Sequence, residues 1–351
     1  MHRSTPGLRT ALPALLACAL AACGDPAPVG PDATGAASLK RGGSSAPVSA
    51  AARLFVTGLE YSQGSTVGPG GALFVTEGAA GRISRVDPRT GAVTTYASGL
   101  PATIPAAGIG GAVDVAFIGG TAYVLVTLVG ADVGGSDAVG IYRVDGPGSF
   151  TLVADIGAFN LANPPSTAFF IPTGVQYALE AYRGALLVTD GHHNRVLHVA
   201  LDGGITEFAV FGNIVPTGLE VWGNTVLMAE AGPIPHLPEN GRVVAIDPQS
   251  GTATEVARGA RLLVDVERGR GGTLFALAQG FWNGPFEGAP AQPNTGALVR
   301  VNGDGTLTEI VGGLDRPTSF EIIGNTAYVI TIAGEIWTIA DIASPPFGRS
   351  R

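Results

Sequence analysis

From residue 51 onward, short segments of alternating apolar and polar residues are separated by turn-forming residues, and this pattern repeats along the chain. One repeated phrase is a strand, a turn and a second strand, as in "RISRVDPRTGAVTTYASGL" and "RVVAIDPQSGTATEVARG". Alternation with a period of two is typical of half-buried strands, and Asp or Asn followed by Gly or Pro between them favours a hairpin. The five copies carry their turn residues at Asp87, Asp145, Asp202, Asp247 and Asn302.

A second phrase precedes each copy and also reads as strand, tight turn and strand, as in "STVGPGGALFVTEG" and "TGLEVWGNTVLMAEAG". Each unit therefore predicts four antiparallel strands. A sixth unit, residues 316–342, has only three, whereas "RLFVTGL", residues 53–59, matches the fourth strands of the other units. We predict an all-β fold, a six-bladed β-propeller in which the N-terminal strand completes the last blade and closes the ring.

The first 23 residues have the pattern of an export signal. Arg3 and Arg9 form a basic N-terminal region, and the apolar run that follows at residues 11–22 is too short to span a bilayer. The run ends in "LAAC", which resembles a bacterial lipobox with Cys23 as the lipidated residue. Ordinary signal cleavage at a small-residue site is the alternative. We expect an exported lipoprotein, anchored to a membrane through Cys23 and facing the periplasm or the cell exterior.

These patterns divide the chain into four segments. Residues 1–22 are predicted to be a lipoprotein signal peptide, and residues 23–50, rich in Pro, Gly, Ala and Ser, a flexible tether. Residues 51–342 form the predicted propeller, which we expect to be monomeric. Residues 343–351 are a C-terminal tail.

The charge of the chain argues against a nucleic-acid partner, and its cysteine content argues against an internal disulfide. The chain has 20 basic and 28 acidic residues, and its net charge is −8. An acidic protein of this kind is a poor candidate for binding nucleic acid. The 2 cysteines are Cys18, inside the signal, and Cys23, so the mature chain cannot form an internal disulfide.

Four phrases, "GALFVTEG", "VTDGHHNRVLHV", "EFAVFGNIVPTGLEV" and "GRISRVDP", resemble the ScyD/ScyE family. Members of this family are exported six-bladed propellers of the NHL and SMP-30-like kind, named for their association with synthesis of the pigment scytonemin. The resemblance covers residues 53–342. It implies a fold and a compartment, but no established activity. His192 and His193 stand where the family commonly has two glycines, so the resemblance assigns no role to either histidine.

The end of the second strand in each unit is one place where side chains from different blades could converge near the channel mouth. Aligning the units there gives Glu77, Thr127, Asp190, Glu230, Gln279 and Thr331. Three carboxylates, Glu77, Asp190 and Glu230, could hold a divalent cation such as Ca²⁺. The alternative is that each side chain bonds turn amides within its own blade.

Asp114 and Asp265 form a second candidate pair. They stand at the same level of the first strands of blades two and five, which lie opposite each other in a six-membered ring. The two carboxylates could share a cation across the channel. Alternatively, each is a structural aspartate that accepts hydrogen bonds from backbone N–H groups of the neighbouring blade.

The pair His192 and His193 falls in the turn after the second strand of blade three. Either histidine could act as a base or a ligand, with His236 as a distant partner, but no spacing typical of a metal site is present. The alternative is an ordinary turn.

The blade-five insertion, residues 280–296, holds Phe281, Trp282 and Phe286. Large aromatic residues on a Gly- and Pro-rich loop suggest a ligand-binding lip, to which His236 of the blade-four insertion could contribute. The alternative is a loop that folds down over the edge of the blade.

Two functions follow from these candidates. The first is a binding or scaffold module in the cell envelope, for a small molecule or an envelope protein. The alternative is a metal-dependent hydrolase or lyase, similar to SMP-30 lactonases or streptogramin lyases, in which the three carboxylates hold the metal and His192 or His193 moves the proton. The sequence contains no nucleophile motif, phosphate-binding glycine loop or redox cysteine pair.

Overall fold

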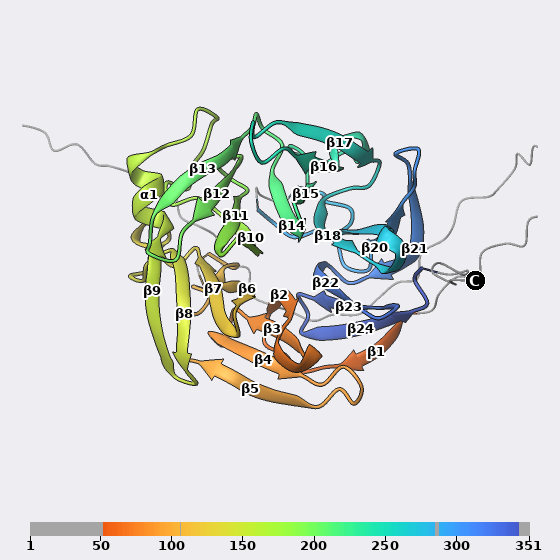
Figure 1. Cartoon of the computed structure of the whole chain (residues 1–351), viewed down its shortest axis with the longest axis horizontal. Helices are drawn as coiled ribbons and strands as arrows, with labels where there is room; N and C mark the ends of the chain where they lie inside the picture. Colours follow the sequence, from red (N-terminus) through yellow and green to blue (C-terminus); the bar gives the residue numbers. More distant parts are fainter. Residues whose placement is uncertain (1–51, 106, 285–287, 344–351) are drawn as a thin grey trace, which may run out of the picture. The chain divides into compact units, whose positions relative to one another are not determined.

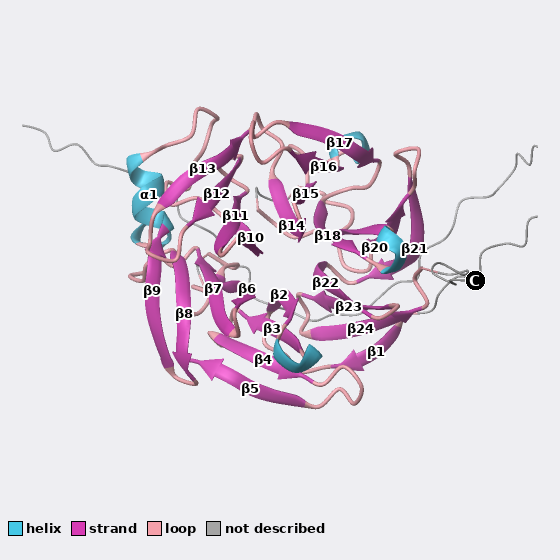
Figure 2. Ribbon diagram, in the orientation of Figure 1, coloured by secondary structure: helices cyan, strands magenta, loops and turns pink. Residues whose placement is uncertain are grey.

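The computed structural model describes residues 52–105, 107–284 and 288–343. Within these residues, six four-stranded antiparallel sheets form a ring (Figures 1 and 2), and the predicted six-bladed β-propeller is confirmed. The predicted signal peptide, the tether with Cys23, and Phe286 lie outside the described residues. The described residues contain no helix that is long and apolar enough to cross a membrane.

In the first three blades, the strands follow one another from the channel to the rim in chain order. Blade one comprises β2 (Ser62–Val67), β3 (Leu73–Glu77), β4 (Arg82–Val86) and β5 (Val93–Ser98). Blade two comprises β6 (Gly111–Ile118), β7 (Thr121–Thr127), β8 (Gly140–Gly146) and β9 (Ser149–Asp155). Blade three comprises β10 (Gln176–Tyr182), β11 (Ala185–Asp190), β12 (Arg195–Val199) and β13 (Ile205–Val210).

The same order continues in the other half of the ring, except for the last strand. Blade four comprises β14 (Pro216–Trp222), β15 (Thr225–Glu230), β16 (Arg242–Ile246) and β17 (Ala253–Arg258). Blade five comprises β18 (Leu263–Arg268), β19 (Leu274–Ala278), β20 (Gly296–Val301) and β21 (Leu307–Leu314). Blade six comprises β22 (Pro317–Ile323), β23 (Thr326–Thr331), β24 (Glu335–Ala340) and β1 (Arg53–Val56).

The N-terminal strand closes the ring as predicted. β1 pairs antiparallel with β24, with Arg53 opposite Thr338 and Leu54 opposite Trp337. This pairing joins the two ends of the propeller within one sheet, so the last blade has no missing outer strand. Since an unpaired strand edge is a site for aggregation, the closure also protects the fold.

The aspartates that predicted the hairpins act inside the turns. The Oδ1 atom of Asp87 accepts a hydrogen bond from the backbone N–H of Arg89 at 2.8 Å, and Asp247 does the same for Gln249 at 2.7 Å. Such bonds satisfy amides that the strand ladder leaves free. The sequence pattern therefore identified the turns for the correct physical reason.

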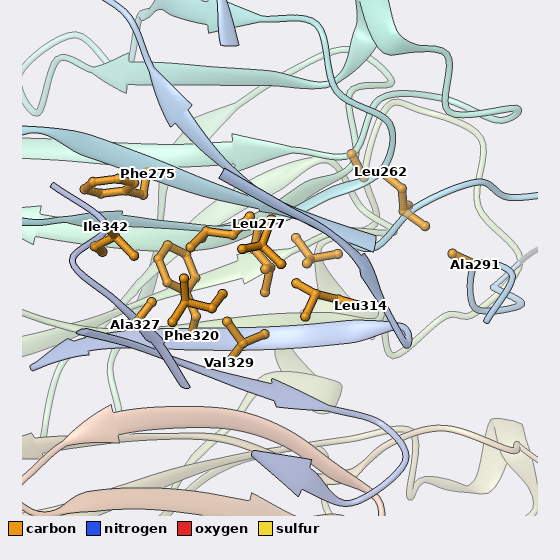
Figure 3. Packing of buried hydrophobic residues seen from close by; sticks show 14 of the residues in the cluster. Leu262, Phe275, Leu277, Ala291, Leu314, Phe320, Ala327, Val329 and Ile342 are labelled. Carbon is orange, nitrogen blue, oxygen red and sulfur yellow. The ribbon is translucent and has the colours of Figure 1, made fainter. Parts of the chain in front are cut away.

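The core lies between the blades, because each sheet presents apolar residues on both faces. Figure 3 shows the cluster between blades five and six, where Phe275 and Leu277 pack against Phe320 and Val329. All four side chains are fully buried. Burying a side chain of this size contributes about 1.5–3 kcal/mol, so these interfaces hold neighbouring blades together.

The six inner strands surround the centre of the ring (Figure 1), and β10 lies opposite β22. Tyr177 of β10 reaches across: its hydroxyl donates a hydrogen bond to the carbonyl oxygen of Thr318 in β22 at 2.7 Å. A second contact, 2.6 Å between the hydroxyls of Ser65 and Ser319, joins blades one and six. The channel is therefore bridged by a side chain at this level.

Because the strands alternate in direction, the loops after the second strand of each blade share one face with the connections between blades. The longest loops are on this face. They include residues 156–175, which contain the helix α1 (Ile156–Ala162), the blade-four insertion 231–241, and the described residues 279–284 and 288–295 between β19 and β20. We call this side the loop-bearing face, and the candidate residues at the second-strand ends lie at its base.

Candidate functional site

The histidine pair fixes a loop of the loop-bearing face. The Nε2 atom of His192 accepts hydrogen bonds from the backbone N–H groups of Phe170 at 2.8 Å and Ile171 at 3.1 Å. Nε2 of His193 lies 3.0 Å from the carbonyl oxygen of Ile171. Burial, reinforced by the neighbouring His193, lowers the pKa of His192 to about 4, which keeps it neutral as an acceptor. Both histidines therefore contact the backbone of this loop.

Asn194, the next residue of the turn, holds a second loop on the other side of blade three. Its Oδ1 atom accepts hydrogen bonds from the backbone N–H groups of Ile214 at 2.9 Å and Val215 at 3.0 Å. Asn194 has a positive φ of 56°, a conformation that Asn tolerates better than most residues. The turn "GHHN" thus holds both connections that flank blade three.

Three blades share a carboxylate and an arginine as cross-strand partners at the end of the second strand. The pairs are Glu77 with Arg82, Asp190 with Arg195, and Glu230 with Arg242. This repeated arrangement allows a comparison within one molecule, because the same two residue types face each other in three different surroundings.

In blade one the pair is fully formed. Nε of Arg82 donates to Oε1 of Glu77 at 2.9 Å, and a terminal nitrogen donates to Oε2 at 2.5 Å. Glu77 also accepts hydrogen bonds from the Ser84 hydroxyl and the backbone N–H of Glu60. Burial opposes ionisation, but these donors together hold the pKa of Glu77 below its usual value.

In blade three the pair belongs to a buried network. Asn160 of α1 donates to Oδ2 of Asp190 at 2.7 Å, and Nδ1 of His193 lies 3.2 Å from the same oxygen. Nε of Arg195 is 3.6 Å from Asp190, and a terminal nitrogen bonds Glu207 at 2.7 Å. Asp190 and Arg195 are at most 1% exposed, so the network ties α1 to blade three.

Blade four has the same residues but not the same contacts. Glu230 is 3% exposed, and its side chain makes no hydrogen bond or ion pair with any described residue. Arg242 instead lies 3.7 Å from Glu255, which also bonds Arg258 at 2.6 Å. In blades one and three the turn between carboxylate and arginine is residues 78–81 and 191–194, whereas in blade four it is the insertion 231–241. The backbones of Glu230 and Arg242 still pair across the two strands, so only the side chain of Arg242 differs in placement, lying near Glu255 instead.

Burial raises the pKa of Glu230 to about 7; the positive charge of Arg242 opposes this rise and the negative charge of Glu255 adds to it. The Nε atom of Arg242 is itself buried and makes no hydrogen bond. Glu230 is thus a carboxyl group that exchanges its proton near neutral pH, at the base of the loop-bearing face.

The predicted acidic ring is not assembled. Among the described residues, no group of three His, Cys, Asp or Glu side chains is placed to hold a metal ion. Glu77 and Asp190 turn toward donors within or beside their own blades, and Glu230 stands alone. The described structure does not bring these three carboxylates together, because separate sheets direct the aligned side chains to separate places.

Asp114 and Asp265 join neighbouring blades, as the structural alternative expected. Oδ2 of Asp114 accepts the backbone N–H of Leu179 at 2.7 Å, and Oδ2 of Asp265 accepts that of Phe320 at 2.9 Å. Burial raises the pKa of Asp265 to about 7. Each aspartate fastens its blade to the next one, so the shared cation across the channel is not needed to explain them.

The glycine facing each aspartate makes this contact feasible. A Cβ atom on Gly64 would lie 2.3 Å from Oδ1 of Asp114, and one on Gly218 would lie 2.5 Å from Oδ1 of Asp265. No side chain fits at these distances. The preceding blade therefore approaches the aspartate through backbone alone.

Sequence reasoning missed the glutamates of the inner strands. They occupy one equivalent position in four successive blades: Glu180, Glu220, Glu267 and Glu321. Burial raises the pKa of each, and the negative charges of neighbouring carboxylates raise most of them further. The signal was present, because "ALEAY", "GLEVW", "VERG" and "FEIIG" place Glu late in each inner strand, but only the register shows that they face one channel.

The predicted aromatic lip is formed only in part. Trp282 is 9% exposed, and its ring packs edge-on against His236 with 5.5 Å between the ring centres. Trp282 also packs against the hydrophobic cluster of blades five and six. Phe281 is 43% exposed with the guanidinium of Arg261 above its ring. A more exposed aromatic residue is Phe170, at 55%, on the loop that His192 holds.

No protein-family model and no curated protein matches the sequence, so the resemblance to the ScyD/ScyE family is not confirmed. Solved structures match the fold. They include virginiamycin B lyase from Staphylococcus aureus, with 16% identity and a TM-score of 0.51 over 83% of this chain and 98% of that one. PQQ-bound aldose sugar dehydrogenase from Streptomyces coelicolor has 15% identity and a TM-score of 0.57 over 84% and 99%.

A gluconolactonase from Xanthomonas campestris matches with 13% identity and a TM-score of 0.57 over 83% of this chain and 89% of that one. At such low identities the likeness shows the propeller fold and nothing finer. The activity of this chain has to be argued from its own residues.

Proposed function

We propose that this propeller is an enzyme of the hydrolase or lyase type, which acts on a small organic substrate by proton transfer at the loop-bearing face. The observation that carries the proposal is Glu230, a buried carboxyl that makes no hydrogen bond with any described residue and has a pKa of about 7. A general base works best when its pKa lies near the working pH. The same fold carries enzymes that are named as a lyase and a gluconolactonase, so it is compatible with this function.

The chemistry uses the chain's own carboxyl group. In hydrolysis, ionised Glu230 takes a proton from water as the water oxygen attacks an acyl carbon, and the proton then passes to the departing oxygen as its bond to carbon breaks. In a lyase reaction, Glu230 takes a proton from a carbon next to a carbonyl, and the electron pair left behind expels a group from the neighbouring carbon. The Nε–H of Arg242, which makes no hydrogen bond with a described residue, would stabilise negative charge that develops nearby.

The proposal is tested by screening lactones and esters with a pH indicator that reports acid release. For any substrate that is turned over, Glu230→Gln should lower kcat by about 100-fold or more. Glu239→Gln, an exposed residue of the same insertion, is the matched control and should leave kcat unchanged. The wild-type rate should rise with pH and level off above about 7, the pKa of Glu230. Equal activity of the two variants would contradict the role of Glu230.

A second candidate function is a binding module, which the exposed Phe169 and Phe170 favour. They are 40% and 55% exposed on a loop that the histidine pair fixes, and rigid apolar side chains bind at a low entropic cost. If no lactone or ester is turned over and ligand binding depends on these two residues, the propeller is a binding module and not an enzyme.

We further propose that the protein is exported and anchored through a lipid on Cys23, with the "LAAC" pattern as support. Mass spectrometry of the mature N-terminus should find a diacylated cysteine, and Cys23→Ser should release the protein from the membrane fraction. An unmodified N-terminus would refute the anchor.

A further inference from the structure

An open surface cavity of about 500 Å³ lies at the outer junction of blades one and two. Its walls come from the connection after β5, with Leu100 and Pro101, from the blade-two loop with Asp137, and from Tyr142 of β8 and Phe150 of β9. Pockets that bind small molecules have volumes of roughly 300–1,000 Å³. This cavity is in a different blade from Glu230 and is independent of the proposed activity.

Two aromatic side chains form a fixed wall of the cavity. The Tyr142 hydroxyl donates a hydrogen bond to the carbonyl oxygen of Ala138 at 2.9 Å, which sets the position of its ring. Phe150 lies beside Gly99, the first residue of the connection after β5. Both rings are partly exposed. They therefore present apolar surface to a ligand without first having to move.

The charge at the cavity is negative and uncompensated. Asp137 is exposed, and its carboxylate forms no ion pair or hydrogen bond with a described residue. Burial raises the pKa of Tyr142, and the negative charges of Asp137 and Asp155 raise it further, so the field of both carboxylates reaches this ring. Arg143, the nearest basic residue along β8, is bonded to Asp145 at 2.6 Å.

We propose that this cavity binds an organic ammonium ion. A carboxylate beside aromatic rings matches a cation that carries apolar groups, because the rings attract the charge and cover the alkyl surface. An anion would be repelled by Asp137. A bare metal ion would find one carboxylate in the wall rather than the several oxygen ligands that it needs.

The experiment is a ligand-observed NMR titration of the whole protein with two probes, choline and 3,3-dimethylbutan-1-ol. The two molecules have nearly the same shape, but the alcohol has a neutral carbon in place of the charged nitrogen. Choline should bind saturably in the millimolar range, and the alcohol clearly more weakly. Asp137→Asn should weaken choline binding about three- to fivefold, as expected for an exposed ion pair. Phe150→Leu should weaken it by a similar factor, because the ring face is lost.

Asp145→Asn is the matched control, since Asp145 lies on β8 like Tyr142, is outside the cavity and is paired with Arg143. It should leave choline binding unchanged. The proposal is overturned if choline does not bind, if the neutral alcohol binds equally well, or if Asp137→Asn has no more effect than Asp145→Asn. Asp137 is exposed, so its substitution does not threaten the fold.

Discussion

The buried, unpaired Glu230 predicts an unusual pH dependence of stability. Its pKa is about 7 in the folded protein, against 4.5 for the unperturbed group. The folded state therefore holds the proton more tightly than the unfolded state, and the protein loses stability as the pH rises from about 4.5 through 7. Each unit of pKa difference corresponds to about 1.4 kcal/mol, so the full loss at pH 8.5 is on the order of 3 kcal/mol.

Glu230→Gln removes this penalty, because glutamine is neutral at every pH. The variant should match the wild type at pH 4.5 and be more stable by on the order of 3 kcal/mol at pH 8.5. Urea unfolding followed by fluorescence of the 3 tryptophans, repeated between these pH values, measures the difference. A difference that stays constant with pH, or a variant that is less stable at pH 8.5, would refute the reasoning.

The equivalent residue of blade one supplies a control with the opposite sign. Glu77 has a lowered pKa because Arg82, Ser84 and the Glu60 amide bond its carboxylate. Glu77→Gln should therefore destabilise the protein at pH 7, by on the order of 2 kcal/mol, because Arg82 loses a partner that is fully buried. If Glu230→Gln and Glu77→Gln shift the stability in the same direction, the two carboxyl groups do not differ in their pairing with arginine.

Two further substitutions test the channel. Gly64→Ala would place a Cβ atom 2.3 Å from Asp114, so it should lower the free energy of unfolding in urea by about 1–3 kcal/mol. Gly212→Ala, with open space around it, is the control and should leave the free energy of unfolding unchanged. Equal effects would count against the close approach of Gly64 to Asp114. Tyr177→Phe should cost about 1 kcal/mol because the carbonyl oxygen of Thr318 loses its donor, and unchanged stability would mean that the bridge across the channel contributes nothing.

The repeat pattern was sufficient for the fold. Alternation with a period of two and Asp-Gly or Asp-Pro turns are local properties, and they placed the hairpins correctly. The displaced fourth strand at residues 53–59 then predicted the pairing of β1 with β24, because only closure explains a strand at the wrong end of the chain. These inferences need only neighbouring residues and a count of units.

The environment of the candidate site residues depends on contacts with distant segments, which a local sequence pattern does not reveal. The sequence aligned Asp114 with Asp265 correctly, but the backbone groups that they bond come from the next blade. It likewise treated His192 as a candidate base, although a loop more than 20 residues earlier supplies the two amides that occupy its nitrogen. Hydrogen-bond partners from distant segments are set by the packing of blades and loops.

The three carboxylate–arginine pairs separate what the sequence determined from what the tertiary structure decided. The sequence by itself placed Glu77, Asp190 and Glu230 at equivalent points, and the strand register of the folded chain sets an arginine opposite each of them. Only the folded chain decided that two of these pairs close and that the third stays open. The physical reason is that the ionisation of a buried carboxyl depends on whether a donor lies within hydrogen-bonding distance, and in blade four the side chain of Arg242 lies near Glu255 and does not bond Glu230.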